Sequence, residues 1–193
     1  KSKNQYFYKD KTNLIPIKTN FIKSSGLINN LCLSIKVALD LGVKKKTIIK
    51  TIPKIKFEGR LQYIKYGKLR KYVNTNDNIL IDGCHSNTSG KNLNNYLKSL
   101  NGPIYGIWGM QKNKMPGEFI KIFKKTFKKM ITITIPNEPN ALSAKELKKL
   151  IIIKDTIYVD NIYEALNTLS SKEKKTIVVF GSLYLIGDVL SKN

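Results

Sequence analysis

The chain has 193 residues, of which 41% are hydrophobic, enough for one well-formed domain together with part of another. Its formal net charge is +22, but the lysines are spread from end to end, and arginine occurs only at Arg60 and Arg70, which argues against a nucleic-acid groove. No apolar run is long enough to cross a membrane and residues 1–11 lack a signal peptide's apolar stretch, so we expect a cytoplasmic protein without membrane or nucleic-acid partners. Cys32 and Cys84 lie in no metal-binding or redox pattern, so neither a metal site nor a disulfide is predicted.

The first part of the chain predicts two short strands and two helices. Apolar residues alternate weakly with polar ones up to about residue 24, which predicts two strands joined near Asp10–Asn13. Helical spacing predicts a helix over Ser25–Leu41 and a shorter one over Lys45–Ile52 that ends at Pro53. Because two strands alone are marginally stable, we interpret residues 1–56 as the end of a preceding domain. The apolar strand positions are Tyr6, Tyr8, Leu14, Ile15, Ile17, Phe21 and Ile22.

From residue 57 onward, strands and helices alternate. This order predicts parallel crossovers and an α/β domain over residues 57–193, with a Rossmann-like, mostly parallel sheet and flanking helices. The lysine-rich run Lys121–Lys129 is interpreted as the solvated face of one of these helices. The strands are expected near Leu61–Tyr66, Ile79–Ile81, Ile104–Trp108, Ile131–Ile135, Thr156–Val159 and Thr176–Phe180, and the helices near Asn87–Leu100, Pro116–Lys129, Ser143–Ile151, Ile162–Leu169 and Leu183–Ser191.

The most informative segment is Asp82-Gly83-Cys84-His85-Ser86, which follows the apolar run Ile79-Leu80-Ile81 and precedes a predicted helix. A buried strand therefore delivers a carboxylate and an imidazole to its carboxyl end, where open α/β sheets bind ligands. The first turn of the next helix offers unpaired amides at the same place, which favour phosphate or carboxylate groups.

Several common active-site patterns are absent from the sequence. It contains neither the GxxxxGK[ST] phosphate loop nor the GxGxxG fingerprint, so it lacks a nucleotide cradle of its own. His85 is the only histidine and Ser182 lies outside a GxSxG elbow, which argues against a serine hydrolase. Arg60 is either a surface cation or a phosphate clamp, and Ser182 either caps a helix or contacts substrate.

Five features carry a resemblance to a known family. In chain order they are a helix start that contains Asn30 (GLINNL), then GRLQ, DGCHS, GM followed by a lysine, and FGSLYLIG. From about Ser25 to its end the chain resembles the C-terminal portion of folylpolyglutamate synthase/dihydrofolate synthase, of the Mur ligase superfamily. DGCHS is similar to the family's DxAHN and FGSLYLIG to its GSLYLxG. The resemblance implies that residues 1–56 end the central ATP-binding domain and that residues 57–193 form the C-terminal glutamate ligase domain.

The resemblance also implies an activity. These enzymes use ATP and Mg²⁺ to phosphorylate a folate or dihydropteroate carboxylate, and the amine of L-glutamate then attacks the acyl phosphate to form an amide. The phosphate loop and the magnesium ligands lie in the N-terminal part of such enzymes, so this chain alone is expected to be an inactive monomer with no metal ligands of its own. By motif, Asn30, Arg60 and Asp82 would contact ATP, while His85 and Ser182 would lie near glutamate.

The sequence departs from the family pattern at several positions, which leaves alternatives open. Ser86 replaces an asparagine, Met115 replaces the aspartate after Lys114, and the His-Gln pair before the Asn30 helix is missing. The physical roles fit nonetheless: Arg60 can neutralise phosphate charge, and His85 can orient an amine or merely shape its loop. Another Mur-type amino-acid ligase, a stand-alone nucleotide- or anion-binding module and a nucleic-acid binder remain as alternative functions.

Overall fold

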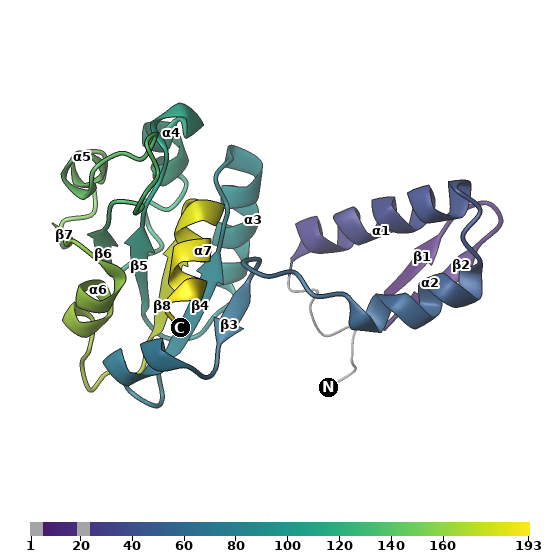
Figure 1. Ribbon diagram of the computed structural model, residues 1–193, viewed down its shortest axis with the longest axis horizontal. Helices are drawn as coiled ribbons and strands as arrows, with labels where there is room; N and C mark the ends of the chain where they lie inside the picture. Colours follow the sequence, from purple (N-terminus) through teal and green to yellow (C-terminus); the bar gives the residue numbers. More distant parts are fainter. Residues whose placement is uncertain (1–5, 19–23) are drawn as a thin grey trace. The chain divides into compact units, whose positions relative to one another are not determined.

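The computed structural model describes residues 6–18 and 24–193 and divides the chain into two compact units, Lys1–Phe57 and Glu58–Asn193 (Figure 1). The first unit has two antiparallel strands, β1 (Tyr6–Lys9) and β2 (Leu14–Ile17), followed by α1 (Ser25–Asp40), α2 (Lys45–Thr51) and a 3₁₀ turn, Ile52–Lys54. The predicted hairpin and both helices are confirmed, although Pro53 lies within the 3₁₀ turn rather than ending α2 directly. The predicted strand positions Phe21 and Ile22 lie outside the described residues.

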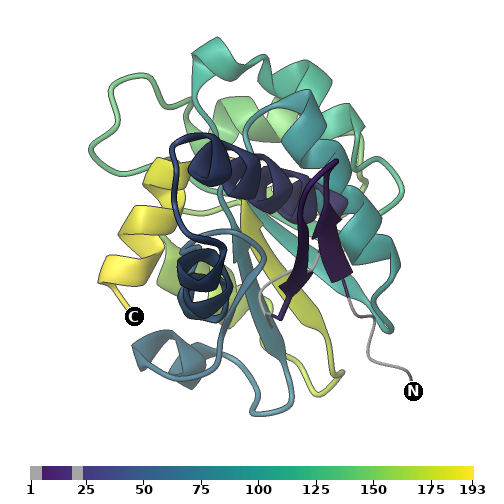
Figure 2. The ribbon, with the colours of Figure 1, turned by 90° about the vertical axis from the view of Figure 1, so that its right-hand side faces the viewer.

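A polar turn and a small apolar cluster hold the first unit together. The Asp10 carboxylate accepts hydrogen bonds from the backbone N–H groups of Thr12 and Asn13 between the strands. These bonds, that of Thr12 foremost, hold the pKa of Asp10 well below its usual range. Both helices pack on the hairpin (Figure 2) through buried side chains at Tyr8, Ile15, Ile17, Leu31, Ile35, Ile48 and Ile52.

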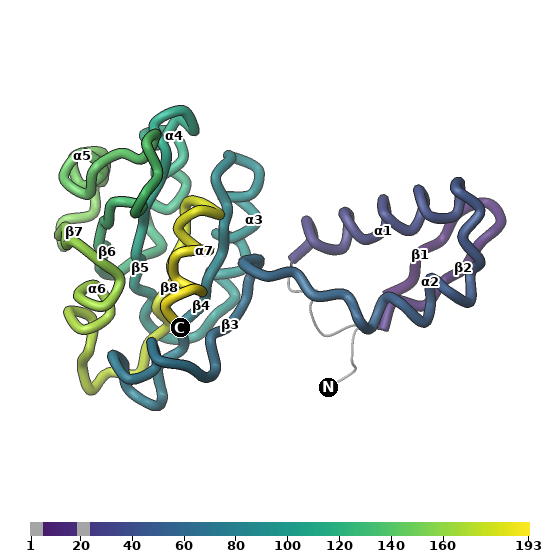
Figure 3. Tube along the Cα trace, in the orientation of Figure 1, coloured from purple at the N-terminus to yellow at the C-terminus, as the bar shows by residue number. Residues whose placement is uncertain are grey.

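The second unit is built on a six-stranded sheet with strand order β3-β4-β8-β5-β6-β7. The edge strand β3 (Gln62–Ile64) is antiparallel to β4 (Asn78–Asp82), and the other neighbours are parallel, so the predicted α/β fold with a mostly parallel sheet is confirmed. The remaining strands are β5 (Ile104–Trp108), β6 (Lys129–Thr132), β7 (Thr156–Tyr158) and β8 (Thr176–Phe180). The chain returns from β7 to place β8 between β4 and β5, a path that Figure 3 traces.

Helices cover both faces of this sheet. On one face α6 (Ile162–Thr168) and α7 (Leu183–Ser191) bury alternate residues of the central strands, including Ile79, Ile81 and Val179. On the other face lie α3 (Asn87–Lys98), α4 (Pro116–Lys121) and α5 (Ala144–Lys149). Phe119, Phe123 and Phe127 pack there against Phe180 of β8, with ring centroids 4.9–6.2 Å apart. Strand residues thus alternate between two apolar layers, as an internal sheet requires.

The predicted helix Pro116–Lys129 is wrong in extent. The helix α4 ends at Lys121, and turns follow it to Thr126 before the chain enters β6 at Lys129. The side-chain amide of Asn94 donates to the carbonyl of Ile122 and caps this helix end from α3. Of the five apolar residues expected on its inner face, Phe119, Phe123, Phe127 and Met130 are buried, whereas Ile122 is only partly buried. The strand predicted at Ile131–Ile135 also ends early, at Thr132, because β5 supplies pairing partners only as far as Trp108.

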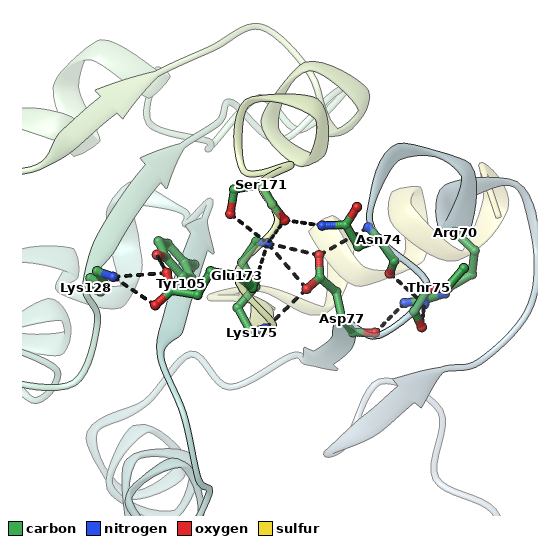
Figure 4. A network of polar contacts seen from close by, with 9 residues as sticks. All are labelled: Arg70, Asn74, Thr75, Asp77, Tyr105, Lys128, Ser171, Glu173 and Lys175. Carbon is green, nitrogen blue, oxygen red and sulfur yellow. Dashed lines mark hydrogen bonds and ion pairs between the residues drawn. The ribbon is translucent and has the colours of Figure 1, made fainter.

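A polar network closes the amino edge of the sheet, where β4 and β8 begin (Figure 4). The side chains of Lys175 and Asp77 are fully buried and form an ion pair with the Nζ and Oδ2 atoms 3.1 Å apart. The ammonium also donates to the carbonyl and hydroxyl oxygens of Ser171 and to the carbonyl of Glu173. The Asp77 carboxylate further accepts the backbone N–H groups of Lys175 and Asn74. This buried pair is therefore saturated with hydrogen bonds, the condition under which burial of two charges is tolerated.

Arg70 completes the amino-edge network. Its guanidinium donates to the carbonyls of Asp77, Asn74 and Thr75 over 2.8, 3.2 and 2.9 Å, so it fastens the turn that leads into β4 (Figure 4). Arg70 therefore has a structural role.

Candidate functional site at the carboxyl edge of the sheet

At the opposite, carboxyl edge of the sheet, neighbouring strands are followed by helices that lie on opposite faces. The helices α3 and α4, which follow β4 and β5, lie on one face of the sheet, whereas α7, which follows β8, lies on the other. Since β8 lies between β4 and β5, the chain diverges on both sides of it, and ligands of open α/β sheets bind in crevices of this kind. Asp82 ends β4, and Ser182 follows β8 after Gly181. In the sheet register Asp82 is paired with Phe180, so both predicted site segments leave the sheet side by side.

The Asp82 carboxylate is 6% exposed and joins two chain segments. Its Oδ2 accepts the backbone N–H of Leu61 at 2.8 Å, and its Oδ1 accepts the backbone N–H of Cys84 at 2.9 Å. Burial raises the pKa of Asp82 above its ordinary value. The two N–H groups and the nearby Arg60 guanidinium favour the charged form and lower this pKa, but their effect is smaller than that of burial. Burial and the Asp82 carboxylate together raise the pKa of the fully buried Cys84 thiol well above its usual range. Cys84 is therefore an unreactive neutral thiol.

Arg60 lies in a tight turn between Gly59 and Leu61. Both neighbours have positive φ, +67° at Gly59 and +45° at Leu61. A Cβ at Gly59 would lie 2.8 Å from Cγ2 of Ile186 on α7, so only glycine fits this turn against that helix. Within the described residues, the Arg60 guanidinium takes part in no hydrogen bond or ion pair, in contrast to that of Arg70. Arg60 is therefore a half-buried cation whose donors are available to an anion.

His85 stands at the start of α3 with a defined tautomer. Its Nδ1 lies 2.9 Å from the carbonyl oxygen of Gly83, and because a carbonyl can only accept, Nδ1 carries the proton. In the neutral ring, Nε2 then keeps a lone pair that can accept a proton from an amine. Ser86 and Ser89 form a reciprocal capping box that fixes this helix start.

Ser182 is 1% exposed and caps α7, with its Oγ accepting the backbone N–H of Tyr184 at 3.2 Å. The preceding Gly181 has φ +116°, and a Cβ there would lie 2.4 Å from the carbonyl oxygen of Gly109 and 2.8 Å from Nε1 of Trp108. Trp108 is fully buried, and among the described residues its indole nitrogen is the one buried side-chain nitrogen or oxygen without a hydrogen-bond partner. The sequence left Ser182 as a cap or a substrate contact, and the structure has the cap.

Arg60, Asp82, His85 and Ser182 form the carboxyl-edge cluster of the second unit, and two further residues considered from the sequence are described separately. Asn30 is an exposed residue of α1 in the first unit. Lys114 is exposed at the end of a short 3₁₀ turn, Lys112–Lys114, and is followed by Met115 in the left-handed conformation at φ +52°.

The backbone groups that hold this cluster were not predicted from the sequence. Gly59 accepts the backbone N–H of Gly83 at 2.8 Å, and its own N–H donates to Oε1 of Gln62 at 2.7 Å. The glycines were a usable signal, since Gly59 precedes Arg60 and Gly83 follows Asp82 directly. Nothing in the sequence marks Leu61 as left-handed, because leucine rarely adopts that conformation.

The donor set at the carboxyl edge fits a phosphate-bearing ligand, because Arg60, beside a helix start, makes no hydrogen bond or ion pair with the described residues and is only attracted by the nearby Asp82 carboxylate. The described residues include no group of three or more His, Cys, Asp or Glu side chains that could hold a metal ion. Among these same residues, no helix is both long and apolar enough to cross a membrane.

Comparison with known families finds a match over residues 62–192 to the family described as "Dihydrofolate synthetase, C-terminal domain". The dihydrofolate synthetase of Saccharomyces cerevisiae is 24% identical over 164 residues, which cover 78% of this chain and 38% of the yeast protein. The chain therefore spans well under half the length of this curated relative.

Solved structures of folylpolyglutamate synthases share the fold. The enzyme from Thermotoga maritima matches 97% of this chain and 42% of its own with a TM-score of 0.72 and 19% identity. The bifunctional folylpolyglutamate synthase/dihydrofolate synthase from Yersinia pestis matches 98% of this chain and 44% of its own with a TM-score of 0.73 and 14% identity. A further structure of the Yersinia enzyme is complexed with AMPPNP and Mn ion, and the Mycobacterium tuberculosis enzyme is complexed with ADP and AMPPCP.

Proposed function

This chain belongs to the dihydrofolate synthetase C-terminal domain family, and we propose on that basis that it is part of an ATP-dependent ligase that joins L-glutamate to a folate or dihydropteroate carboxylate. The relation to folylpolyglutamate and dihydrofolate synthases of the Mur ligase superfamily, expected from the motifs, is confirmed. One observation from the structure supports the proposal above others: Arg60 lies at the carboxyl-edge switch point, and its guanidinium makes no hydrogen bond or ion pair with the residues that the structure describes. Because the proposed reaction consumes ATP, we also propose that it takes place in the cytoplasm.

Arg60 is proposed to neutralise charge on the phosphate that is transferred. The reaction moves a phosphoryl group from ATP to the acceptor carboxylate and later expels phosphate, so negative charge is redistributed at both steps. A preorganised guanidinium in a partly desolvated site stabilises such charge more than a solvated cation does. The arginine fork also suits the geometry of phosphate oxygens.

The other predicted residues receive proposed roles around Arg60. The Asp82 carboxylate, placed beside the nucleotide, would accept a hydrogen bond from a ribose hydroxyl. His85 would orient the glutamate amine or take its proton at Nε2, because Nδ1 is committed to Gly83. Ser182 would place the start of α7 near the glutamate carboxylates, and Asn30 would contact ATP from the first unit.

We further propose that residues 1–56 are the end of a central ATP-binding domain, and that the phosphate loop and magnesium ligands are supplied from outside this chain. The apolar residues exposed on α1 and at its C-terminal cap support this, since Leu33, Val37 and Leu41 are 65%, 48% and 78% exposed. When bound, the magnesium ion would offset phosphate charge. Among the described residues of this chain, no cluster of His, Cys, Asp or Glu side chains could hold that ion.

The test is glutamate incorporation by the full-length protein. Purified enzyme is given ATP, Mg²⁺ and radiolabelled L-glutamate with dihydropteroate or with a reduced folate, which separates first from later glutamate addition. Arg60→Gln is expected to lower kcat/KM by about 10²–10³. The matched control is Arg70→Gln, which removes the chain's other guanidinium at the amino edge and should leave turnover per folded molecule within about twofold of wild type.

The outcomes separate the alternatives. Wild-type turnover in Arg60→Gln would contradict the role proposed for Arg60 at the transferred phosphate. Incorporation of a different amino acid onto a cell-wall nucleotide would indicate another Mur-type ligase. Binding of ADP by this 193-residue chain with no ligase activity in the full-length protein would favour the stand-alone nucleotide-binding module.

A further inference from the structure

We propose that Asp82 is a positioning residue that fastens the Gly59–Leu61 turn to the end of β4 and thereby fixes where the Arg60 guanidinium is presented. This role goes beyond a contact with nucleotide and adds Leu61 to the residues on which the site depends. It rests on the proposed function only for the identity of the anion that Arg60 meets.

The turn is attached to β4 on both sides of Arg60. Before it, the carbonyl of Gly59 accepts the backbone N–H of Gly83 at 2.8 Å. After it, the backbone N–H of Leu61 donates to Oδ2 of Asp82 at 2.8 Å. The β-ladder between β3 and β4 begins only at Gln62, which pairs with Ile81, so these two bonds hold a segment that the sheet itself does not hold.

The backbone at Leu61 explains why a carboxylate is needed there. A leucine at φ +45° is unfavourable because its Cβ crowds the backbone, and such strain persists only where the surroundings enforce it. Leu61 is 3% exposed, so its side chain is packed into the domain while its N–H points at Asp82. A hydrogen bond to a charged, buried acceptor is stronger than one to a neutral group and offsets the strained conformation.

The Asp82 carboxylate is itself held in place. Its second oxygen accepts the backbone N–H of Cys84, the residue two positions ahead, so the carboxylate cannot rotate freely. The Cys84 thiol also hydrogen-bonds to this carboxylate, so three of its four lone-pair positions are used, and a ribose contact to the remaining one is compatible with this positioning role. Removal of the carboxylate is therefore expected to act on Arg60 as well as on the nucleotide.

The first experiment measures amide hydrogen exchange by NMR in the 193-residue chain, in wild type, Asp82→Asn and Asp82→Ala. Exchange at Leu61, relative to the amides of β8, is expected to rise roughly tenfold to hundredfold in Asp82→Ala. Asp82→Asn, whose amide keeps one oxygen acceptor, should fall between Ala and wild type. The matched control is Asp77→Asn, which alters the domain's other buried aspartate at the amino edge and should speed exchange throughout the domain without singling out Leu61.

The second experiment is a double-mutant cycle in the full-length enzyme with Arg60→Gln and Asp82→Asn. If Asp82 acts through Arg60, the loss of kcat that Asp82→Asn causes in wild type should shrink at least about fivefold in the Arg60→Gln background. Full additivity of the two losses would mean that Asp82 acts on the nucleotide alone and would overturn the positioning role. An unchanged relative exchange rate at the Leu61 amide in Asp82→Ala would also overturn the positioning role. The exchange result stands even if the protein is no ligase, so failure of this inference and failure of the proposed function are distinguishable.

Discussion

The two arginines of the chain occupy opposite edges of one sheet in opposite states. At the amino edge, the guanidinium of Arg70 donates to three carbonyls, and the neighbouring Lys175–Asp77 pair is buried and saturated (Figure 4). At the carboxyl edge, Arg60 makes no such bond within the described residues, although the backbone on both sides of it is fastened. The charged groups at the amino edge bind other parts of the chain, whereas the Arg60 guanidinium at the carboxyl edge is available to bind a ligand.

This difference gives a criterion for a binding site in a strongly basic protein. With a formal net charge of +22, the presence of a cation carries little information. A cation is informative when its backbone is tightly held and its donors lack protein partners, because such an arrangement costs stability unless a ligand completes it.

The largest effect is expected at the amino edge, in Lys175→Met. This substitution leaves Asp77 buried without its cation, and breaking such a pair typically costs about 3–5 kcal/mol. Urea unfolding followed by circular dichroism measures the loss. The double variant Asp77→Asn with Lys175→Met should recover part of it, since no unpaired charge then remains. A loss below about 1 kcal/mol in the single variant would mean that the network is not a structural anchor.

A smaller effect should separate the two arginines directly. Arg70→Gln removes donors to three backbone carbonyls and is expected to lower the free energy of unfolding by about 2 kcal/mol. Arg60→Gln removes no hydrogen bond to the part of the chain that the structure describes, and should change this free energy by less than about 0.5 kcal/mol. Thermal or urea unfolding of the two variants side by side provides the comparison, and equal losses would contradict it.

The smallest effect concerns pH, where one carboxylate at each edge is expected to act with opposite sign. Burial raises the pKa of Asp82, so its contribution to stability is present below its ordinary pKa of 3.8 and is lost as the pH rises through the folded-state value. Hydrogen bonds from Lys128 and Tyr105 lower the pKa of Glu173, so its contribution is present above 4.5 and is lost as the pH falls through the folded-state value.

Unfolding measured between about pH 3 and pH 6 tests these signs. Relative to wild type, Asp82→Asn should gain stability as the pH rises, and Glu173→Gln should lose it. The same trend in both variants would show that the two edges do not differ in this respect.

The sequence was sufficient for the parts of the site that local patterns encode. The apolar run before Asp82 predicted a buried strand that ends in a carboxylate, and helical spacing predicted a helix from Asn87. Only the motif GRLQ set Arg60 apart from Arg70, and the sequence did not show that the donors of Arg70 are occupied, because its carbonyl partners come from a turn whose geometry depends on the buried Lys175, far along the chain.

The errors have a similar origin in long-range contacts. The spacing of Phe119, Phe123 and Phe127 suits a helix, but Asn94 caps the carbonyl of Ile122, and the chain turns toward β6. The left-handed Leu61 has no local cause either, since Asp82 holds its N–H from 21 positions away. Sequence patterns thus recovered the elements, and contacts distant in sequence decided where they end and which groups stay free.

Trp108 gives the chain a built-in optical probe. It is the chain's single tryptophan, it is fully buried at the end of β5, and it stacks on Phe119 with ring centroids 6.5 Å apart. An indole shielded from water and without a hydrogen-bond partner emits at shorter wavelengths than one in solvent. Fluorescence excited selectively at tryptophan therefore reports on Glu58–Asn193 alone, and it does so from beside Gly181, next to the segment that carries Ser182.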